Sequence, residues 1–350
     1  MAAKVPFRLV LLKSTCAAIL LLYTSLLAAQ TTTVFVEPYR TWVSQSVQVP
    51  AGQYLYYELQ LNRANSLVAR FNVEGGLNNQ ANVWLLDASN FAQFKAGRTF
   101  SVYQGTSGTV QGIADYRFPI PQTDNYVLVV DNRKALLMAR KVHLYIYELY
   151  QQPTEESLRQ QRALQSVYDS LKKLLVFKDF RIISRHCGTV NAFSNPDITM
   201  CAELAESLAD KKLVDALPFV MFHELGHTLL RLWDYPLYDN EDVADEFATV
   251  ISLLANKTDF ALAAARWWST DPSEREALSK LWVDDRHTVS PQRARNIIRW
   301  INDPDELLRR WHKILVPNMQ SDALRALDEQ RNTWINHELI KAELKRRTTM

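Results

Sequence analysis

Beyond its first thirty residues the sequence lacks long apolar runs, internal repeats and an excess of charge of either sign. Without a second apolar run, the chain beyond that point is predicted to be soluble. Residues 1–29 hold 3 of the 40 basic side chains and none of the 38 acidic ones, which leaves 37 basic against 38 acidic side chains in the remainder. This balance predicts no nucleic-acid partner and no membrane partner for the processed chain. The length of 350 residues and a hydrophobic share of 47% predict a folded protein of two domains.

Cysteine is also scarce. Of three cysteines, Cys16 falls within the N-terminal apolar run, which leaves Cys187 and Cys201 in the rest of the chain. Two cysteines without CxxC spacing cannot form a thiolate zinc site unless histidines help. In an oxidising compartment this pair predicts a disulfide between adjacent strands, and two free thiols are the alternative.

The first thirty residues differ in character from the rest. Lys4, Arg8 and Lys13 precede the uncharged run STCAAILLLYTSLLAAQ, which ends in small residues. A basic N-terminal region, an apolar central region and small residues at the cleavage site are typical of a secretory signal peptide, which is predicted here over residues 1–29. An uncleaved anchor that begins near Phe7 is the alternative. The mature protein is therefore expected to be secreted or periplasmic.

Two different patterns follow the signal peptide. Residues 31–150 contain short alternating segments, among them TVFVEPY and NYVLVVDN, separated by Gly, Asn, Pro and Asp. This rhythm predicts an antiparallel β-sandwich with jelly-roll-like character. Its aromatic residues are candidate contacts for carbohydrate or a protein partner, although aromatic strand residues are more often core. The polar residues 151–157 are predicted to be a linker.

Residues 158–350 are predicted to form a mainly α-helical domain with a small sheet, so the fold class is α+β. Apolar spacing indicates a helix over residues 155–175, and two short strands, FRIISRHC and DITMC, surround the loop GTVNAFSNP. DITMC precedes the next predicted helix and is a candidate edge strand along which an extended peptide could pair.

The segment FHELGHTLL lies on a helix predicted to begin around Asp215, with Pro218 in its first turn, where a proline costs no hydrogen bond. At about 100° per residue, His223 and His227 lie one turn apart on one face, and Glu224 projects beside them. Two neutral imidazoles can hold a zinc ion while the carboxylate takes a proton from water. Gly226 indicates that another part of the chain comes close to this helix.

A catalytic zinc needs a third protein ligand. After thirteen intervening residues, the second histidine is followed by EDVADEFATVISLL, a predicted helix with Asn240 or Asp239 as its cap. Glu241 is the predicted third ligand, and Asp245, one turn further on, is predicted to accept the second ring N–H of a ligand histidine. Asp242 is the rival ligand, and acidic residues at a helix N-terminus are also explained by the helix dipole.

HELGH followed by ExxADxFA resembles the zinc peptidases of the gluzincin type. The match is carried by Glu241, Ala244, Asp245, Phe247 and Ala248. Together with CGTVNAF, ITMCAEL and DRHTVSPQRARN, it also resembles a bacterial family of secreted, metallopeptidase-like proteins of unknown function. The resemblance implies one zinc ion per chain, with Glu241 as the third ligand and Asp245 behind the ligands. The short spacing from the second histidine to Glu241, compared with many gluzincins, keeps Asp242 as an alternative.

A further donor is expected to stabilise the oxyanion formed when water attacks a peptide carbonyl. His287, in WVDDRHTVSPQR, is the candidate, with Tyr235 and Tyr238 as alternatives. The other explanation for His287 is an ordinary loop histidine in an acidic turn.

These features together predict a zinc metallopeptidase that hydrolyses a peptide or protein substrate, with Glu224 as general base. The alternative is a non-catalytic binding or assembly protein of the cell envelope that keeps a peptidase-like scaffold. An intact Glu224 argues against that alternative, because a metal site that only binds does not need this carboxylate.

Overall fold

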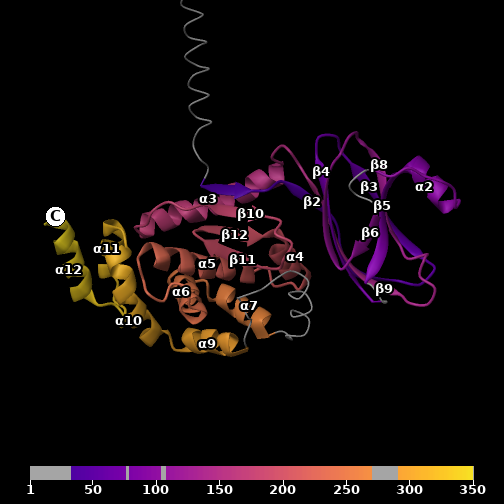
Figure 1. The fold of residues 1–350 in the computed structure, drawn as a ribbon. Helices are drawn as coiled ribbons and strands as arrows, with labels where there is room; N and C mark the ends of the chain where they lie inside the picture. Colours follow the sequence, from indigo (N-terminus) through magenta and orange to yellow (C-terminus); the bar gives the residue numbers. More distant parts are fainter. Residues whose placement is uncertain (1–32, 76–78, 104–107, 270–290, 350) are drawn as a thin grey trace, which may run out of the picture.

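The computed structural model describes residues 33–75, 79–103, 108–269 and 291–349 (Figure 1). The predicted signal peptide, residues 1–29, lies outside this part of the chain. Strands dominate the first half of the described chain and helices dominate the second, which confirms the α+β class. Figure 1 shows the strand-rich part at the right and the helical part at the left.

Two four-stranded antiparallel sheets make up the strand-rich part, here called the two-sheet domain. One sheet has the order β2 (Tyr39–Val49), β9 (Arg140–Leu149), β4 (Ser66–Glu74), β7 (Ile113–Pro119); the other has the order β3 (Tyr54–Leu61), β8 (Asp124–Asp131), β5 (Gln80–Asp87), β6 (Gly108–Gln111). Alternate side chains of both sheets, such as Leu61 of β3 and Phe71 of β4, lie in one shared core. The jelly-roll character of this domain stays a prediction.

A short helix, α2 (Ala88–Lys95), lies within the two-sheet domain, although no helix was predicted there. Asp87 caps it by accepting a hydrogen bond from the Asn90 backbone. Phe91 and Phe94 of α2 pack on Val129 of β8. Because α2 covers this outer face while the shared core covers the inner one, most of β8 is buried on both faces.

A third sheet belongs to the helical part. Its order is β1 (Val34–Val36), β10 (Ile182–Arg185), β12 (Asp197–Cys201), β11 (Ala192–Asn195). β1 and β12 run parallel to β10, whereas β11 is antiparallel to β12. Cys187 and Cys201 form a disulfide with a Cα–Cα distance of 5.4 Å, which links the end of β12 to the chain just after β10, as the pairing of the two cysteines predicted.

Two expectations about strands are wrong. The segment TVFVEPY was assigned to the β-sandwich of residues 31–150, but β1 within it pairs with β10 because Val34 is buried in the core of the helical part. The strand DITMC was expected to be a free edge, but β12 lies between β10 and β11. The two edge strands of this sheet in the described chain are therefore β1 and β11, and β11 comes from the segment predicted to be a loop.

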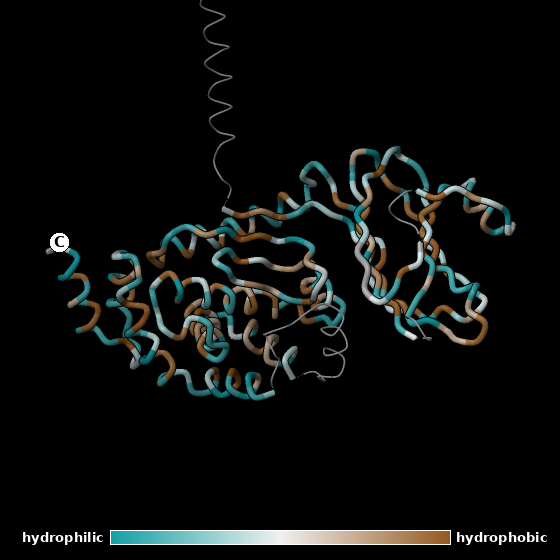
Figure 2. Tube along the Cα trace, viewed as in Figure 1, coloured by the Kyte–Doolittle hydropathy of each residue, from teal (hydrophilic) through white to brown (hydrophobic). Residues whose placement is uncertain are grey.

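Helices surround this sheet and one another (Figures 1 and 2). They are α3 (Glu155–Leu174), α4 (Ala202–Asp210), α5 (Ala216–Leu232), α6 (Glu241–Leu254), α7 (Thr258–Ser269), α9 (Pro291–Asn302), α10 (Pro304–Leu315), the 3₁₀ turn η1 (Val316–Asn318), α11 (Ser321–Asp328) and α12 (His337–Thr348). The helix predicted over residues 155–175 is confirmed as α3, which starts at a capping box between Thr154 and Ser157. In the described ranges no helix is long and apolar enough to cross a bilayer.

Helix α5 is the most buried of these helices. It packs against β11 and β12 on one side and against α6 and α7 on the other. Its sequence is apolar nearly all round, as expected of a helix inside a core, and every residue from Phe219 to Leu230 is buried. The polar residues of the HELGH motif are therefore held in an environment shielded from water.

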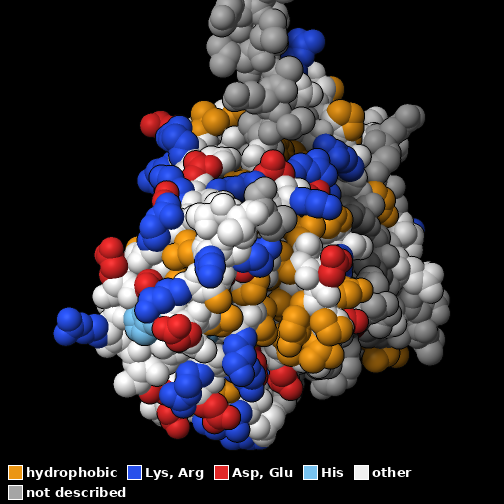
Figure 3. Space-filling model, turned by 90° about the vertical axis from the view of Figure 1, so that its left-hand side faces the viewer, with side chains coloured by type: hydrophobic (Ala, Val, Ile, Leu, Met, Phe, Trp, Pro, Cys, Tyr) orange, Lys and Arg blue, Asp and Glu red, His pale blue; other side chains and the backbone are white. Residues whose placement is uncertain are grey.

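The helical part has an apolar groove at its C-terminal end. The groove has a volume of about 290 Å³ and lies between α3, α6, α10 and α11; its lining includes Leu174, Leu254 and Leu315. Figure 3 looks at this end of the molecule and shows hydrophobic side chains surrounded by Lys, Arg, Asp and Glu.

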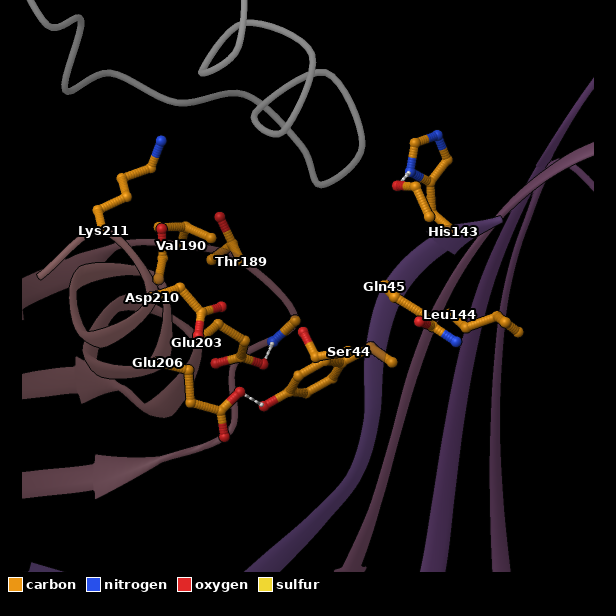
Figure 4. A pocket seen from close by; sticks show the side chains of 14 residues that line it. Ser44, Gln45, His143, Leu144, Thr189, Val190, Glu203, Glu206, Asp210 and Lys211 are labelled. Atoms are coloured by element: carbon orange, nitrogen blue, oxygen red, sulfur yellow. Dashed lines mark hydrogen bonds between the residues drawn. The ribbon is translucent and has the colours of Figure 1, made fainter. Parts of the chain in front are cut away.

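The two-sheet domain and the helical part meet at His186, just after β10. Its ring stacks on Tyr147 with centroids 3.7 Å apart, and Tyr39 contacts it edge-on at 3.9 Å. Glu206 of α4 accepts a hydrogen bond of 2.8 Å from the Tyr145 hydroxyl across the same boundary. A pocket of about 340 Å³ opens here, between β2 and β9 on one side and α4 on the other (Figure 4).

Candidate metal centre

The two histidines of the HELGH motif converge as their spacing predicted. His223 and His227 are 3% and 6% exposed, and their Nε2 atoms lie 3.1 Å apart. Both lie on the face of α5 that meets α6. Two buried imidazole nitrogens at this distance form two corners of a metal site.

Glu241 supplies a third corner. It is the first residue of α6, whose cap is Asn240, with a side chain that accepts a hydrogen bond from the Val243 backbone. The Glu241 carboxylate oxygens lie 3.2 Å from His223 Nε2 and 3.5 Å from His227 Nε2. Asp242 is exposed and is not part of the cluster that these donors form in the described chain. The geometry therefore favours Glu241 over Asp242.

The donor distances fit zinc. Nitrogen and oxygen ligands lie about 2.0–2.1 Å from zinc, so two corners of a tetrahedron around it are about 3.3 Å apart. The three distances within the cluster, from 3.1 to 3.5 Å, bracket that value. Two imidazoles and one carboxylate are also the donor set of a catalytic zinc site with an open fourth position.

Hydrogen bonds on the far side of each ring fix how the histidines point. His223 Nδ1–H donates to Asp245 Oδ1 at 2.8 Å, and His227 Nδ1–H donates to the Tyr238 carbonyl at 2.7 Å. With the proton on Nδ1, the Nε2 lone pair of each neutral ring is directed into the cluster. Asp245 thus lies where the sequence predicted, whereas the contribution of the Tyr238 backbone was not predicted.

Arg293 of α9 completes this network and was missed by sequence reasoning. Its guanidinium binds Asp245 through two hydrogen bonds of 2.6 and 2.7 Å, and its Nη1 lies 3.1 Å from Glu241 Oε2. The same guanidinium lies over the Trp268 ring, 4.3 Å from its centroid. A sequence signal did exist, because Arg293 falls on the buried stripe of α9 with Ile297, where an arginine needs a partner.

Burial and hydrogen bonding act in opposite directions on these groups. Burial lowers the pKa of His223, but its contacts with Asp245 and Glu241 outweigh this and raise that pKa to about 9. Burial raises the pKa of Asp245, yet hydrogen bonds from Arg293 and His223 leave it below its ordinary value. A proton and a metal ion therefore compete for the His223 ring.

Glu224 follows His223 directly in α5 and has one buried carboxylate oxygen without a described partner. Its side chain is 2% exposed, and its Oε2 has no hydrogen-bond partner among the residues that the structure describes. A buried carboxylate oxygen that is left unpaired is costly to the fold. This cost is explained if the oxygen faces water or substrate at the metal site.

Gly226 allows α5 and α6 to approach closely, as its position in the motif predicted. A Cβ atom at residue 226 would lie 3.2 Å from Phe247 Cβ and 3.3 Å from Ala244 Cα, both on α6. The close contact of the two helices brings Glu241 and Asp245 to the histidines.

Replacing Gly226 with alanine is expected to destabilise the protein by about 1–3 kcal/mol, because the added methyl group overpacks the helix contact. In an open helix the same change would stabilise by about 1 kcal/mol, so the sign of the effect is the test. Urea unfolding of Gly226→Ala measures it. A variant more stable than wild type would contradict the close packing of α5 on α6.

Replacing Arg293 with glutamine is expected to weaken zinc binding by about 10–100-fold, because Asp245 and Glu241 lose the group that holds them. The cost in stability is about 3–5 kcal/mol, as for other broken buried ion pairs. Competition with a chromophoric chelator measures the affinity. Arg293→Lys should recover part of it, since lysine keeps the charge but not the two-pronged geometry.

Arg295→Lys is the matched control, because Arg295 lies exposed on the same helix and bonds only to Gln292 in the described contacts. Equal zinc affinities for wild type and Arg293→Gln would contradict a positioning role for Arg293.

The predicted oxyanion donor is a separate case from the histidine–glutamate cluster. His287 lies outside the described residues, so its role as oxyanion donor stays a prediction. Of its two alternatives, Tyr235 is half-buried, and the ring of Tyr238 lies under the Arg231 guanidinium at 4.8 Å.

Comparison with known proteins agrees with this site. Residues 148–308 match the sequence profile of a protein family described as “Putative metallopeptidase”. No curated protein matches the chain significantly. Among solved structures, PliG from Aeromonas hydrophila, a periplasmic inhibitor of g-type lysozyme, is similar to part of this chain. The similarity covers 33% of this chain and 97% of PliG, with 12% sequence identity and a TM-score of 0.20. The matched residues 148–308 of this “Putative metallopeptidase” family include the whole histidine–glutamate cluster and Arg293.

Proposed function

We propose that this protein is a zinc-dependent metallopeptidase that hydrolyses peptide bonds, with Glu224 as general base. The observation that carries the proposal is the cluster of His223, His227 and Glu241, with Glu224 next to His223 in the sequence and its buried Oε2 without a hydrogen-bond partner in the described chain. The metallopeptidase family match over the same residues supports it.

His223, His227 and Glu241 would hold the metal through two Nε2 atoms and one carboxylate oxygen. Zinc bound there supplies Lewis acidity, which makes water a better nucleophile and polarises a peptide carbonyl. Asp245 and the Tyr238 carbonyl keep both rings in the orientation that directs Nε2 into the cluster.

Glu224 moves the proton in this proposal. It accepts a proton from the attacking water and returns it to the nitrogen of the leaving amine. An unpaired Oε2 suits this task, because a carboxylate already bound to a cation would be a weaker base. Arg293 has a different role, since it holds Asp245 and Glu241 and does not bond to Glu224 in any described contact.

The substrate is proposed to be an extended peptide that pairs with β11. This strand is one of the two edges of its sheet in the described chain and is the edge that lies against α5, where Ser194 Oγ and Thr228 Oγ1 are 2.8 Å apart. Backbone pairing at an edge strand would bind peptides of many sequences. Export through residues 1–29 to the periplasm or the cell exterior remains part of the proposal.

Incubation of the purified protein with an unbiased peptide library, followed by mass spectrometry of the products, tests the function. Cleavage that stops with a chelator and returns with zinc is expected. Peptide binding without cleavage, by wild type loaded with zinc, would favour the non-catalytic binding or assembly protein.

A further inference from the structure

The loop that joins β8 to β9 exposes an apolar tip. Leu136 and Leu137 are each 92% exposed, and the adjacent Met138 is 54% exposed. Elsewhere in the described chain no large hydrophobic side chain is more than 53% exposed. Turns favour polar residues and glycine, so three consecutive apolar side chains at such a tip call for an explanation.

The base of this loop is firmly held, so the exposure belongs to an ordered structure. Asn132 is buried, and its side-chain nitrogen donates to the carbonyls of Val49 and Met138 at 3.0 and 3.1 Å. Arg140 donates to the carbonyls of Gln80 and Met138 at 2.7 and 3.3 Å. Hydrogen bonds on both sides of the tip therefore keep the two leucines directed away from the domain.

Basic residues flank the apolar tip in the sequence and on the adjacent helix α2. Those on the loop and its flanking strand are Arg133, Lys134, Arg140 and Lys141. The C-terminal end of α2 lies against this loop, because Arg133 donates to the Phe94 carbonyl at 3.5 Å, and it adds Lys95 and Arg98.

In the described contacts these six basic side chains have two acidic partners. Asp131 pairs with Arg133 at 2.9 Å, and Glu74 pairs with Lys141 at 3.8 Å. The local excess is therefore four positive charges, although the chain as a whole is nearly neutral. An apolar tip within a basic ring is complementary to a layer of anionic headgroups above acyl chains.

We propose that this loop docks the protein on an anionic phospholipid surface. Leu136, Leu137 and Met138 enter the boundary between headgroups and acyl chains, while the surrounding basic side chains contact phosphate. A protein partner fits less well, because a stable interface buries about 800 Å² on each side and a tip of three residues offers far less. The proposal revises the expectation of no membrane partner, which rested on the total charge, and it is independent of the metal centre.

Hydrogen exchange of the full chain, with and without vesicles, tests this directly. Amides of residues 133–140 are expected to be protected by vesicles of phosphatidylcholine and phosphatidylglycerol, and not by phosphatidylcholine alone. The apolar segment at residues 1–29 is the same in all variants, and exchange at the loop is measured separately from it.

Vesicle flotation of variants gives the second measurement. Leu136→Ser combined with Leu137→Ser is expected to weaken binding at least about tenfold, and Lys134→Gln about fivefold. Val214→Ser combined with Leu237→Ser is the control, because these side chains are 53% and 48% exposed on the helical part. It should leave binding unchanged.

Absence of protection at residues 133–140 in the vesicle-bound protein would overturn the proposal. So would equal vesicle affinity of wild type and the double leucine variant. Equal binding to vesicles with and without phosphatidylglycerol would overturn the role of the basic ring. Because the substituted side chains are exposed, the unfolding temperature of every variant should match that of wild type. A matching temperature shows that a change in vesicle binding is not caused by misfolding.

Discussion

Replacing Glu224 with glutamine is expected to abolish peptide hydrolysis while zinc binding is retained. Glutamine has nearly the same shape but cannot accept the proton of the attacking water, so the rate should fall by about 10²–10⁴-fold or more. None of the three metal donors is changed. Peptide cleavage and zinc content are measured on the same preparation.

Two results would contradict this role. Full activity of Glu224→Gln would show that another group is the base. Loss of zinc from the variant would show that Glu224 supports the metal and not the proton transfer. Circular dichroism of the variant is the control for folding, since residue 224 is buried in α5.

Replacing Glu241 with alanine is expected to remove one of three zinc ligands and to weaken zinc binding by more than about 100-fold. Losing a residue that only hydrogen-bonds a ligand costs up to about 100-fold, and losing a ligand itself should cost more. Asp242→Ala is the matched control, because Asp242 is the next residue on α6 and is exposed. It should bind zinc nearly as wild type does. Isothermal titration with zinc compares the two.

The opposite pattern, with weak binding by Asp242→Ala and normal binding by Glu241→Ala, would assign the ligand to Asp242. That outcome would require α6 to turn about its axis, since Glu241 now faces both histidines at 3.2 and 3.5 Å.

The histidine–glutamate cluster was largely predictable because its parts depend on local helix geometry. The spacing of His223 and His227 sets them on one face wherever the helix lies. Asn240 marks the start of α6 through its capping hydrogen bond, which places Glu241 in the first turn. Sequence alone could not decide whether Glu241 or Asp242 is the third ligand, because the choice depends on how α6 is rotated against α5.

Contacts between distant segments were not predictable in the same way. Arg293 reaches Asp245 across 48 residues of sequence, and nothing in the spacing of α9 indicates which helix it meets. The pairing of β1 with β10 joins Val34 to Ile182 over a still greater separation. The position of a strand within its sheet was not predictable either. A short strand such as DITMC has the same sequence pattern at the edge of a sheet as in its middle.

Zinc content of the purified wild-type protein tests the central claim most directly. Inductively coupled plasma mass spectrometry should find about one zinc per chain, and the double variant His223→Ala, His227→Ala should contain none. A wild-type protein that contains no zinc, and binds none when zinc is added, would contradict the assignment of this cluster as a metal centre.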